Sequence, residues 1–492
     1  MNRSAEINHS PSTVGHTPTG APPWRMPADA GRLVLVLTAA LLVGIAIAVD
    51  LRITVALLAA VLAAATVHTR MWLTVMTVVI AGLVLLSWGF NNIPFPAGGL
   101  AIPLVDVLLL YALVASFPLW WSATTQSHLG KRLLLLLCAL AFVAAVRLAL
   151  DIPRFGVVAG RDALYVLEAW AVLVGIAVGR AIGAARADRA LALLWRLAVL
   201  FFLLFPLRDF LAELGPEVGV QRPIPLIQFT TAGFIAATSL FWFLQEQRRS
   251  APFFAGLSLL VLLMVQVRGQ LLAVAATFII GSLLRVGPLT SAVGGRGLPP
   301  VARRACIVIG TGLLVVALLP PIPGRLEEPV GLDTVTAQLK TLAGEEGPGS
   351  GSLEHRAETW PKVVDKVLDS RGGWLVGVGY GPDLFFGFTI DGDVEVRKPH
   401  NDFLEIWART GLVGFLPWVA LLGTLALWAF RAAPRSRYGW WLLALQISVL
   451  ASALTQPAFA FAYIGLVYMF LMGLRIGTHP RARHPRSVPT NQ

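Results

Sequence analysis

Long apolar runs dominate the pattern of hydrophobic and polar positions along the chain. About fourteen of them approach the roughly 20 residues that an α-helix needs to cross the hydrocarbon core of a bilayer. They lie near residues 32–49, 53–68, 71–89, 101–120, 132–150, 162–180, 190–206, 227–244, 252–267, 269–285, 304–321, 411–430, 438–455 and 457–474. The pattern therefore predicts an all-α polytopic membrane protein with about 12–14 transmembrane helices.

Polar stretches divide these runs into groups. Residues 1–31 are rich in Pro, Ser, Thr and Gly, which predicts a disordered cytoplasmic tail. Residues 32–321 would hold transmembrane helices 1–11, and residues 402–474 the last transmembrane helices. Between them, residues 322–401 form the one long polar segment that is large enough for a small fold. A basic cytoplasmic tail is predicted at 475–492.

The positions of Lys and Arg predict the orientation of the chain. Basic residues favour the cytoplasmic ends of membrane helices. If the N-terminus is cytoplasmic, every strong basic cluster falls inside, namely Arg70, Lys131–Arg132, Arg180–Arg189, Arg248–Arg249, Arg285–Arg304, Arg431–Arg437 and the C-terminal tail. The long segment at 322–401 then lies outside, and it holds eight basic against thirteen acidic residues. We therefore expect one large, acidic, extracytoplasmic loop.

Composition excludes several classes of protein and site. Only 13% of the residues are charged, whereas soluble domains average about 25%. The net charge of +12 comes from short clusters between apolar runs, so it indicates membrane topology and no nucleic-acid partner. The two cysteines, Cys138 and Cys306, belong to no motif, and the chain has no Cys-x-x-Cys or His-x-x-x-His pair. Neither a disulfide framework nor a metal site is expected.

The predicted external loop contains two features of interest. LEHRAETWPKVVDKVL at 353–368 has apolar residues at helical spacing and predicts an amphipathic helix over the membrane mouth, with Pro361 near its start. Arg356 in its first turn could face a ligand, and Trp360 either packs on a sugar ring or marks the membrane interface. GVGYG, centred on Gly379, lacks the lysine of a P-loop, so it favours a tight turn where backbone approaches a substrate.

A histidine and two arginines are the candidates for chemistry. His400 precedes an apolar helix and can accept a proton near neutral pH, while Asn401 and Glu405 can fix its position. Arg268 lies between two apolar runs on the side of His400, where an arginine must pair or face water; the alternative is a snorkelling turn residue. Arg222, in QRPIPLIQF, is a weaker candidate of the same type. Converging guanidinium groups suit a diphosphate.

Taken in order, these motifs resemble the O-antigen ligase and O-antigen polymerase superfamily. The resemblance covers about residues 260–430 and rests on an Arg-Gly after an apolar run, then HRAETW, GVGYG and HNDFLEIWARTGLVG. It implies a GT-C-like, metal-independent glycosyltransferase without a cofactor, in the bacterial cytoplasmic (inner) membrane with its active site facing outward. Such enzymes move a glycan from undecaprenyl diphosphate to an acceptor hydroxyl. Val267 departs from the commoner pattern, which has a small hydroxyl residue before the arginine.

The resemblance also implies roles for individual residues. Arg268 and Arg356 would hold the lipid diphosphate, His400 would activate the acceptor hydroxyl, and Asn401 and Glu405 would position the histidine. The acceptor could be a glycan, a lipid or a protein, and the motifs do not separate a ligase from a polymerase. The alternative function is a transporter or flippase of a lipid-linked or anionic substrate. A transporter is expected to show internal repeats, and the sequence has no clear repeat, which favours the enzyme.

Overall fold

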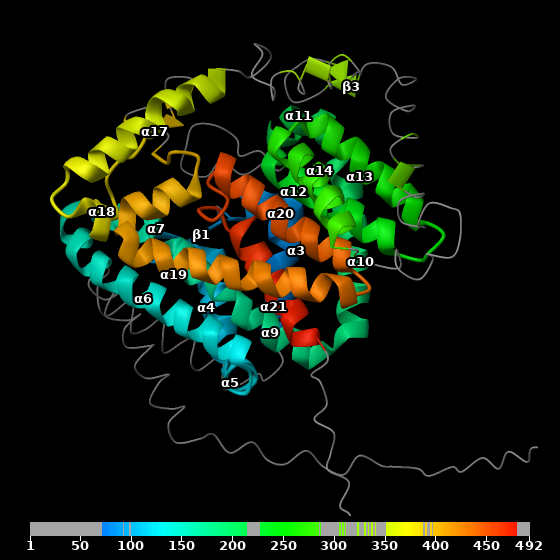
Figure 1. Cartoon of the computed structure of the whole chain (residues 1–492), viewed down its shortest axis with the longest axis horizontal. Helices are drawn as coiled ribbons and strands as arrows, with labels where there is room; N and C mark the ends of the chain where they lie inside the picture. Colours follow the sequence, from blue (N-terminus) through cyan, green and yellow to red (C-terminus); the bar gives the residue numbers. More distant parts are fainter. Residues whose placement is uncertain are drawn as a thin grey trace, which may run out of the picture.

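The computed structural model describes residues 71–91, 93–97, 100–213, 227–284, 351–386 and 397–479, with shorter pieces between 286 and 340 and between 389 and 395 (Figure 1). The N-terminal tail, the predicted helices at 32–49 and 53–68, and most of the predicted helix at 304–321 lie outside the described residues. So do Arg222 and the end of the C-terminal tail from residue 480 onward.

Helices make up most of the described structure. They are α3 (Met71–Asn91), α4 (Leu104–Ala115), α5 (Phe117–Thr125), α6 (His128–Phe155), α7 (Val157–Asp162), α8 (Leu164–Ala169), α9 (Ala171–Ile182), α10 (Ala184–Phe202), α11 (Arg208–Glu213), α12 (Phe229–Gln245), α13 (Ala251–Val265), α14 (Arg268–Leu283), α17 (Gly351–Asp369), α18 (Gly373–Val376), α19 (Asp402–Ala432), α20 (Gly439–Thr455) and α21 (Gly465–Thr478). Three antiparallel hairpins accompany them, namely β1 (Pro94–Ala97) with β2 (Leu100–Pro103), β3 (Ile322–Pro323) with β4 (Pro329–Val330), and β5 (Thr389–Ile390) with β6 (Val394–Glu395). The predicted all-α polytopic membrane protein is confirmed.

The apolar runs predicted where these helices lie. By length and composition, four described helices can cross a membrane, or six if two bent pairs each form one span, and five shorter apolar helices accompany them. One bent pair is α4 with α5, which meet at 65°, and the other joins α10 to the segment at Phe205–Leu211 at 49°. Several predicted spans are thus broken helices. The total of about 12–14 membrane helices stays a prediction.

The last predicted span begins later than its apolar run. The sequence predicts a helix from residue 457, whereas α21 begins at Gly465 and the residues before it form a buried, irregular segment. Backbone without helical hydrogen bonds is tolerated at membrane depth only where other groups of the protein satisfy it. Here the Phe459 N–H donates to Asp402 Oδ2 at 2.9 Å. Asp402, 57 residues away in sequence, thus satisfies backbone of the irregular segment that precedes α21.

Glycines allow α9 and α21 to pack closely. Gly175 and Gly179 are four residues apart in α9, as are Gly473 and Gly477 in α21. A β-carbon at any of these glycines would collide with backbone of the facing helix, such as the Val172 carbonyl opposite Gly473. Small residues spaced by four are a common device for close contact between membrane helices. Most of α9 and α21 is consequently buried.

Replacing Gly473 by Ala should destabilise the protein. The new methyl group has no room against the Val172 carbonyl, so α9 and α21 must separate, at a cost of about 1–3 kcal/mol or more. Gly423→Ala in α19 is the matched control, because a β-carbon there meets no atom within 4 Å. Thermal unfolding of the detergent-purified variants measures the difference. Equal midpoints for Gly473→Ala and Gly423→Ala would contradict the close packing.

The helices α14 and α20 define two ends of the bundle. They run antiparallel, since Gly269 packs on Thr455 at one end and Gly281 packs on Trp440 at the other. Arg475 lies at the Trp440 end, where its guanidinium stacks on neighbouring aromatic rings and pairs with Asp188 at 2.5 Å. Arg268 begins α14 at the opposite end.

α17 lies at the edge of the bundle and packs on α18 and α19. Figure 1 shows α17 (yellow) along the rim of the helices, with α18 between it and α6. It corresponds to the helix predicted over 353–368. Its apolar face buries Val363 and Val367 against Leu384 and Ala408, which closes a small second core. Its opposite face exposes charged residues such as Lys362, so the predicted amphipathic pattern matches its packing.

Candidate active site

A break in α19 lets the glycine-rich loop dock onto it. Gly411 interrupts the helix with φ 58°. The break frees carbonyl groups before it, and the Ala408 carbonyl accepts from the Val378 N–H at 2.7 Å while the Arg409 carbonyl accepts from the Gly379 N–H at 3.1 Å. The loop after α18 thus takes hydrogen bonds that a continuous helix would have made internally.

Two glycines make this contact possible. Gly377, with φ 76°, lies directly against the Arg409 carbonyl, and Gly411 lies directly against the Leu375 carbonyl. A β-carbon on either would strike backbone, and both have a positive φ that favours glycine. Gly379, with φ 97°, faces the side chains of Arg147 and Asp151 in α6. Within GVGYG, Gly377 and Gly379 thus contact α19 and α6.

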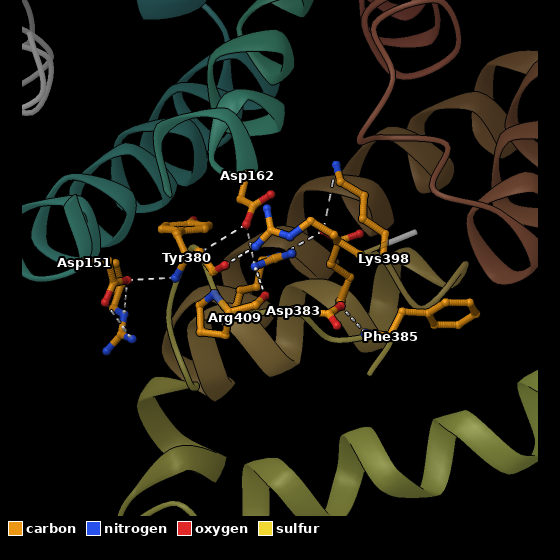
Figure 2. A network of polar contacts seen from close by, with 12 residues as sticks. Asp151, Asp162, Tyr380, Asp383, Phe385, Lys398 and Arg409 are labelled. Carbon is orange, nitrogen blue, oxygen red and sulfur yellow. Dashed lines mark hydrogen bonds and ion pairs between the residues drawn. The ribbon is translucent and has the colours of Figure 1, made fainter. Parts of the chain in front are cut away.

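Buried charges fix the same loop to the membrane helices (Figure 2). The Tyr380 N–H donates to Asp151 Oδ2 at 2.7 Å, and the Gly381 N–H donates to Asp162 Oδ2 at 3.0 Å. Asp162 also forms an ion pair with Arg409 at 2.8 Å, and the Arg409 side chain is completely buried. Burial raises the pKa of Tyr380 well above its usual value, so this phenol stays protonated in its contact with another tyrosine hydroxyl.

Glu405 joins this network to the segment that carries His400. Its Oε1 atom lies 2.9 Å from Arg409 Nε and 3.9 Å from Lys398 Nζ. Lys398 precedes His400 by two residues, and Glu405 follows it by five. The pair therefore ties together the two sides of the turn that holds the histidine. Glu405 itself is buried against Arg409, as an i, i+4 partner within one helix.

His400 occupies a constrained position immediately before α19. Its backbone has φ 53°, in the left-handed region, where His and Asn are among the commoner non-glycine residues. Its half-buried ring stacks on Phe385, with centroids 5.5 Å apart. Asn401 is the N-cap, and its side chain accepts from the Leu404 N–H at 3.1 Å. Asn401 thus fixes where the helix begins, and with it the backbone of His400.

α17 places Arg356 beside this turn. Trp360 Nε1 donates to the Pro399 carbonyl at 2.7 Å, so the tryptophan is anchored one residue before His400. Arg356 lies one helical turn earlier on α17 and is half-buried. Residues four apart share a face of a helix, so Arg356 extends from the same face as Trp360.

Arg268 lies close to Arg356. α13 ends at Val265, a two-residue connection follows, and Arg268 is the first residue of α14, half-buried at the helix N-terminus. Burial, together with the nearby positive charge of Arg268, lowers the pKa of Arg356. Among the residues that the structure describes, no carboxylate forms an ion pair with Arg356. Two guanidinium groups within electrostatic range of one another suit an anion that takes paired hydrogen bonds.

The predicted site residues thus fall into two groups. Trp360 on α17 contacts the turn that holds His400 and Asn401, and Arg356 on the same helix lies within electrostatic range of Arg268. Gly379 and Glu405 belong to the junction between the loop and the membrane helices. Sequence reasoning missed the residues that build this junction. Their signal was present, because Asp151, Asp162 and Arg409 are isolated charges in or beside apolar runs, and such charges are seldom without function.

Comparison with known families agrees with this geometry. The family model described as O-antigen ligase matches residues 253–419, from α13 into α19. This stretch is similar to O-antigen ligase domains. It contains Arg268, Arg356 and His400, and the resemblance to the O-antigen ligase and polymerase superfamily is confirmed. The matched family is a glycosyltransferase-like ligase and polymerase family, which supports an enzyme. No curated protein matches the chain.

Proposed function

We propose that this protein transfers a glycan from an undecaprenyl-diphosphate carrier to an acceptor hydroxyl. The observation that carries the proposal is the approach of Arg268 and Arg356 to one another beside the His400 turn, all within the stretch similar to O-antigen ligase domains. Three separate elements, α14, α17 and the segment before α19, contribute these side chains. A diphosphate would relieve the repulsion between the two arginines and accept paired hydrogen bonds from both.

The reaction needs charge stabilisation and a proton acceptor. The acceptor oxygen forms a bond to the anomeric carbon of the donor sugar, and the bond from that carbon to the diphosphate oxygen breaks. Undecaprenyl diphosphate leaves, and the two arginines stabilise its developing negative charge. His400 takes the proton of the acceptor hydroxyl, held in place by the Asn401 cap and by stacking on Phe385. Positive charge from arginine makes the proposed mechanism metal-independent.

The proposal places the site on the outer face of a bacterial cytoplasmic membrane. Arg268 begins α14 at the end opposite Arg475 and Arg437, whose guanidinium groups both lie over the Tyr438 ring. Since basic residues favour the cytoplasmic end, the Arg268 end faces outward. An acceptor delivered to the outer surface, such as a lipid, a second glycan repeat or a protein, would then reach the site from the side covered by α17.

Transfer by the purified protein in lipid nanodiscs tests this function. Fluorescently labelled undecaprenyl-diphosphate glycan is offered with a lipid acceptor or with a second donor repeat, and release of undecaprenyl diphosphate is followed together with product size. Arg356→Ala should lower the rate by about 10²-fold, because one stabilising charge is lost. The transfer rate of Arg356→Lys should lie between those of the wild type and Arg356→Ala, since an ammonium keeps the charge but lacks the paired donors. Transfer is expected to persist in a chelator.

The matched control is Lys362→Ala, which removes an exposed basic residue from the opposite face of the same helix. It should transfer at the wild-type rate. If Arg356→Ala and Lys362→Ala behave alike, the diphosphate site is wrong. If the wild-type protein releases no undecaprenyl diphosphate with any acceptor, the proposed transfer reaction itself is wrong.

A further inference from the structure

Exposed apolar side chains gather on α18, outside both cores of the protein. Trp374 is 50% exposed, Leu375 41% and Val376 42%. Three consecutive exposed apolar residues are unusual in water, and an exposed patch of this kind marks a contact surface. The α18 helix has only four residues, and its backbone is held from behind by α19 through the contact of Leu375 with Gly411. The side chains of α18 are thus presented outward on a fixed support.

This apolar surface continues that of a membrane-spanning helix. In α6, Leu135, Phe142 and Leu150 are 70%, 69% and 59% exposed, as expected where a helix faces lipid. At the end of α6, exposed Phe155 packs on Gly381, five residues after α18. Figure 1 shows α18 beside the ends of α6 and α7. Exposed apolar side chains therefore extend from the lipid-facing stripe of α6 to α18.

The level of α18 matches the outer boundary of the hydrocarbon. Gly411 lies against α18 and begins the apolar half of α19, which continues to Ala432. Those 22 residues measure about 33 Å at 1.5 Å per residue, close to the thickness of the hydrocarbon core. The α18 helix thus lies where α19 enters the membrane, at the level of lipid headgroups.

Basic residues border the patch. Arg154 lies in the last turn of α6, Arg161 in the last turn of α7 and Arg371 shortly before α18, and all three are exposed. One exposed acidic residue, Asp369 at the end of α17, lies two residues before Arg371. Apolar side chains together with arginines are typical of segments that lie in the interface and attract anionic headgroups, and Trp favours this depth.

We infer that α18 is an interfacial anchor that inserts Trp374, Leu375 and Val376 among the phospholipids of the outer leaflet. The anchor holds the C-terminal end of α17 to the membrane. The other end of α17 carries Arg356, about 20 Å away for thirteen residues of helix. Lipid contact at α18 would therefore set the height of α17 above the site. The occupant is bilayer phospholipid, because the patch is continuous with the lipid-facing side of α6.

Lipid-borne quenchers test this contact without any substrate. Cys138 and Cys306 are replaced by Ala, and an environment-sensitive fluorophore is attached at Leu375→Cys or, independently, at Val376→Cys. The control is Asp365→Cys, on the exposed charged face of α17. The protein is placed at one copy per nanodisc with phospholipids that carry a nitroxide near the headgroup. Labels at 375 and 376 should be quenched at least about twofold more than the label at 365, because only an inserted label touches the nitroxide.

Each outcome decides the question. Stronger quenching at 375 and 376 that persists at one copy per disc supports the lipid anchor. Equal quenching at 365, 375 and 376 overturns it. Blue-shifted emission at 375 that appears only with several copies per disc also overturns it, because a second copy would then cover the patch. The measurement needs no glycan donor, so its result is independent of the proposed transfer reaction.

Discussion

Replacing His400 by Asn should leave the protein folded and lower its rate of glycan transfer by roughly 10²–10⁴-fold, the usual contribution of a general base. Asn suits the left-handed backbone that His400 adopts, and so does not add strain. It cannot accept a proton from an acceptor hydroxyl near neutral pH. The loss should appear in the rate at saturating donor, because Arg268 and Arg356 still bind the diphosphate. Single-turnover transfer in nanodiscs measures it.

Two controls separate chemistry from structure. His128→Ala removes an exposed histidine at the start of α6 and should leave the rate unchanged. Phe385→Leu removes the aromatic ring that stacks on His400, and should lower the rate less than His400→Asn does, since the base is still present. A wild-type rate in His400→Asn would refute the catalytic role. If His400→Asn also binds the donor more weakly, His400 has a structural role in the donor site instead.

Replacing Arg409 by Ala should give the largest loss of stability. The guanidinium is completely buried and pairs with Asp162 and Glu405, so its removal leaves the Asp162 carboxylate without this cation and Glu405 with only the more distant Lys398. Breaking a buried ion pair in this way costs about 3–5 kcal/mol. The loop at 377–381 should loosen as well, because Asp162 holds its Gly381 amide. Thermal unfolding in detergent, followed by the fraction that remains monodisperse, measures the loss.

A neutral triple variant is the control for charge. Arg409→Met combined with Asp162→Asn and Glu405→Gln removes the whole ion cluster and keeps similar volumes. Replacing a complete buried ion group is often nearly neutral, so the triple variant should recover much of the stability lost in Arg409→Ala. If the triple variant is as unstable as Arg409→Ala, unpaired buried charge does not explain the loss of stability, because the triple variant has no such charge and keeps the volume of the side chain.

His400 and Arg409 are connected through one network of ion pairs. Glu405 links Arg409 to Lys398, and Lys398 lies two residues before His400. The buried network therefore supports the turn from behind, while Trp360 holds it from α17 through the Pro399 carbonyl. Loss of Arg409 should consequently lower transfer as well as stability, whereas loss of His400 should lower transfer alone.

The sequence predicted the kind of protein and most of the candidate chemistry. Apolar runs located the described helices, because the length of a hydrophobic segment is a local property. Ordered motifs picked out Arg268, Arg356 and His400, and the O-antigen ligase match covers all three. The amphipathic pattern at 353–368 predicted α17, whose apolar face is buried and whose charged face is exposed.

Only the tertiary structure decided how these parts meet. In the sequence, Gly377 and Gly411 look like unrelated turn and helix signals. In the structure, each leaves room for backbone of the other segment, because Gly377 lies against Arg409 and Gly411 against Leu375. The backbone amides that donate to Asp151 and Asp162 lie more than 200 residues away in the chain. No local pattern encodes such pairs, because they depend on which helix faces are neighbours after packing. The sequence by itself predicted a membrane enzyme with a histidine and two arginines, and packing decided that α17 meets the turn that carries the histidine.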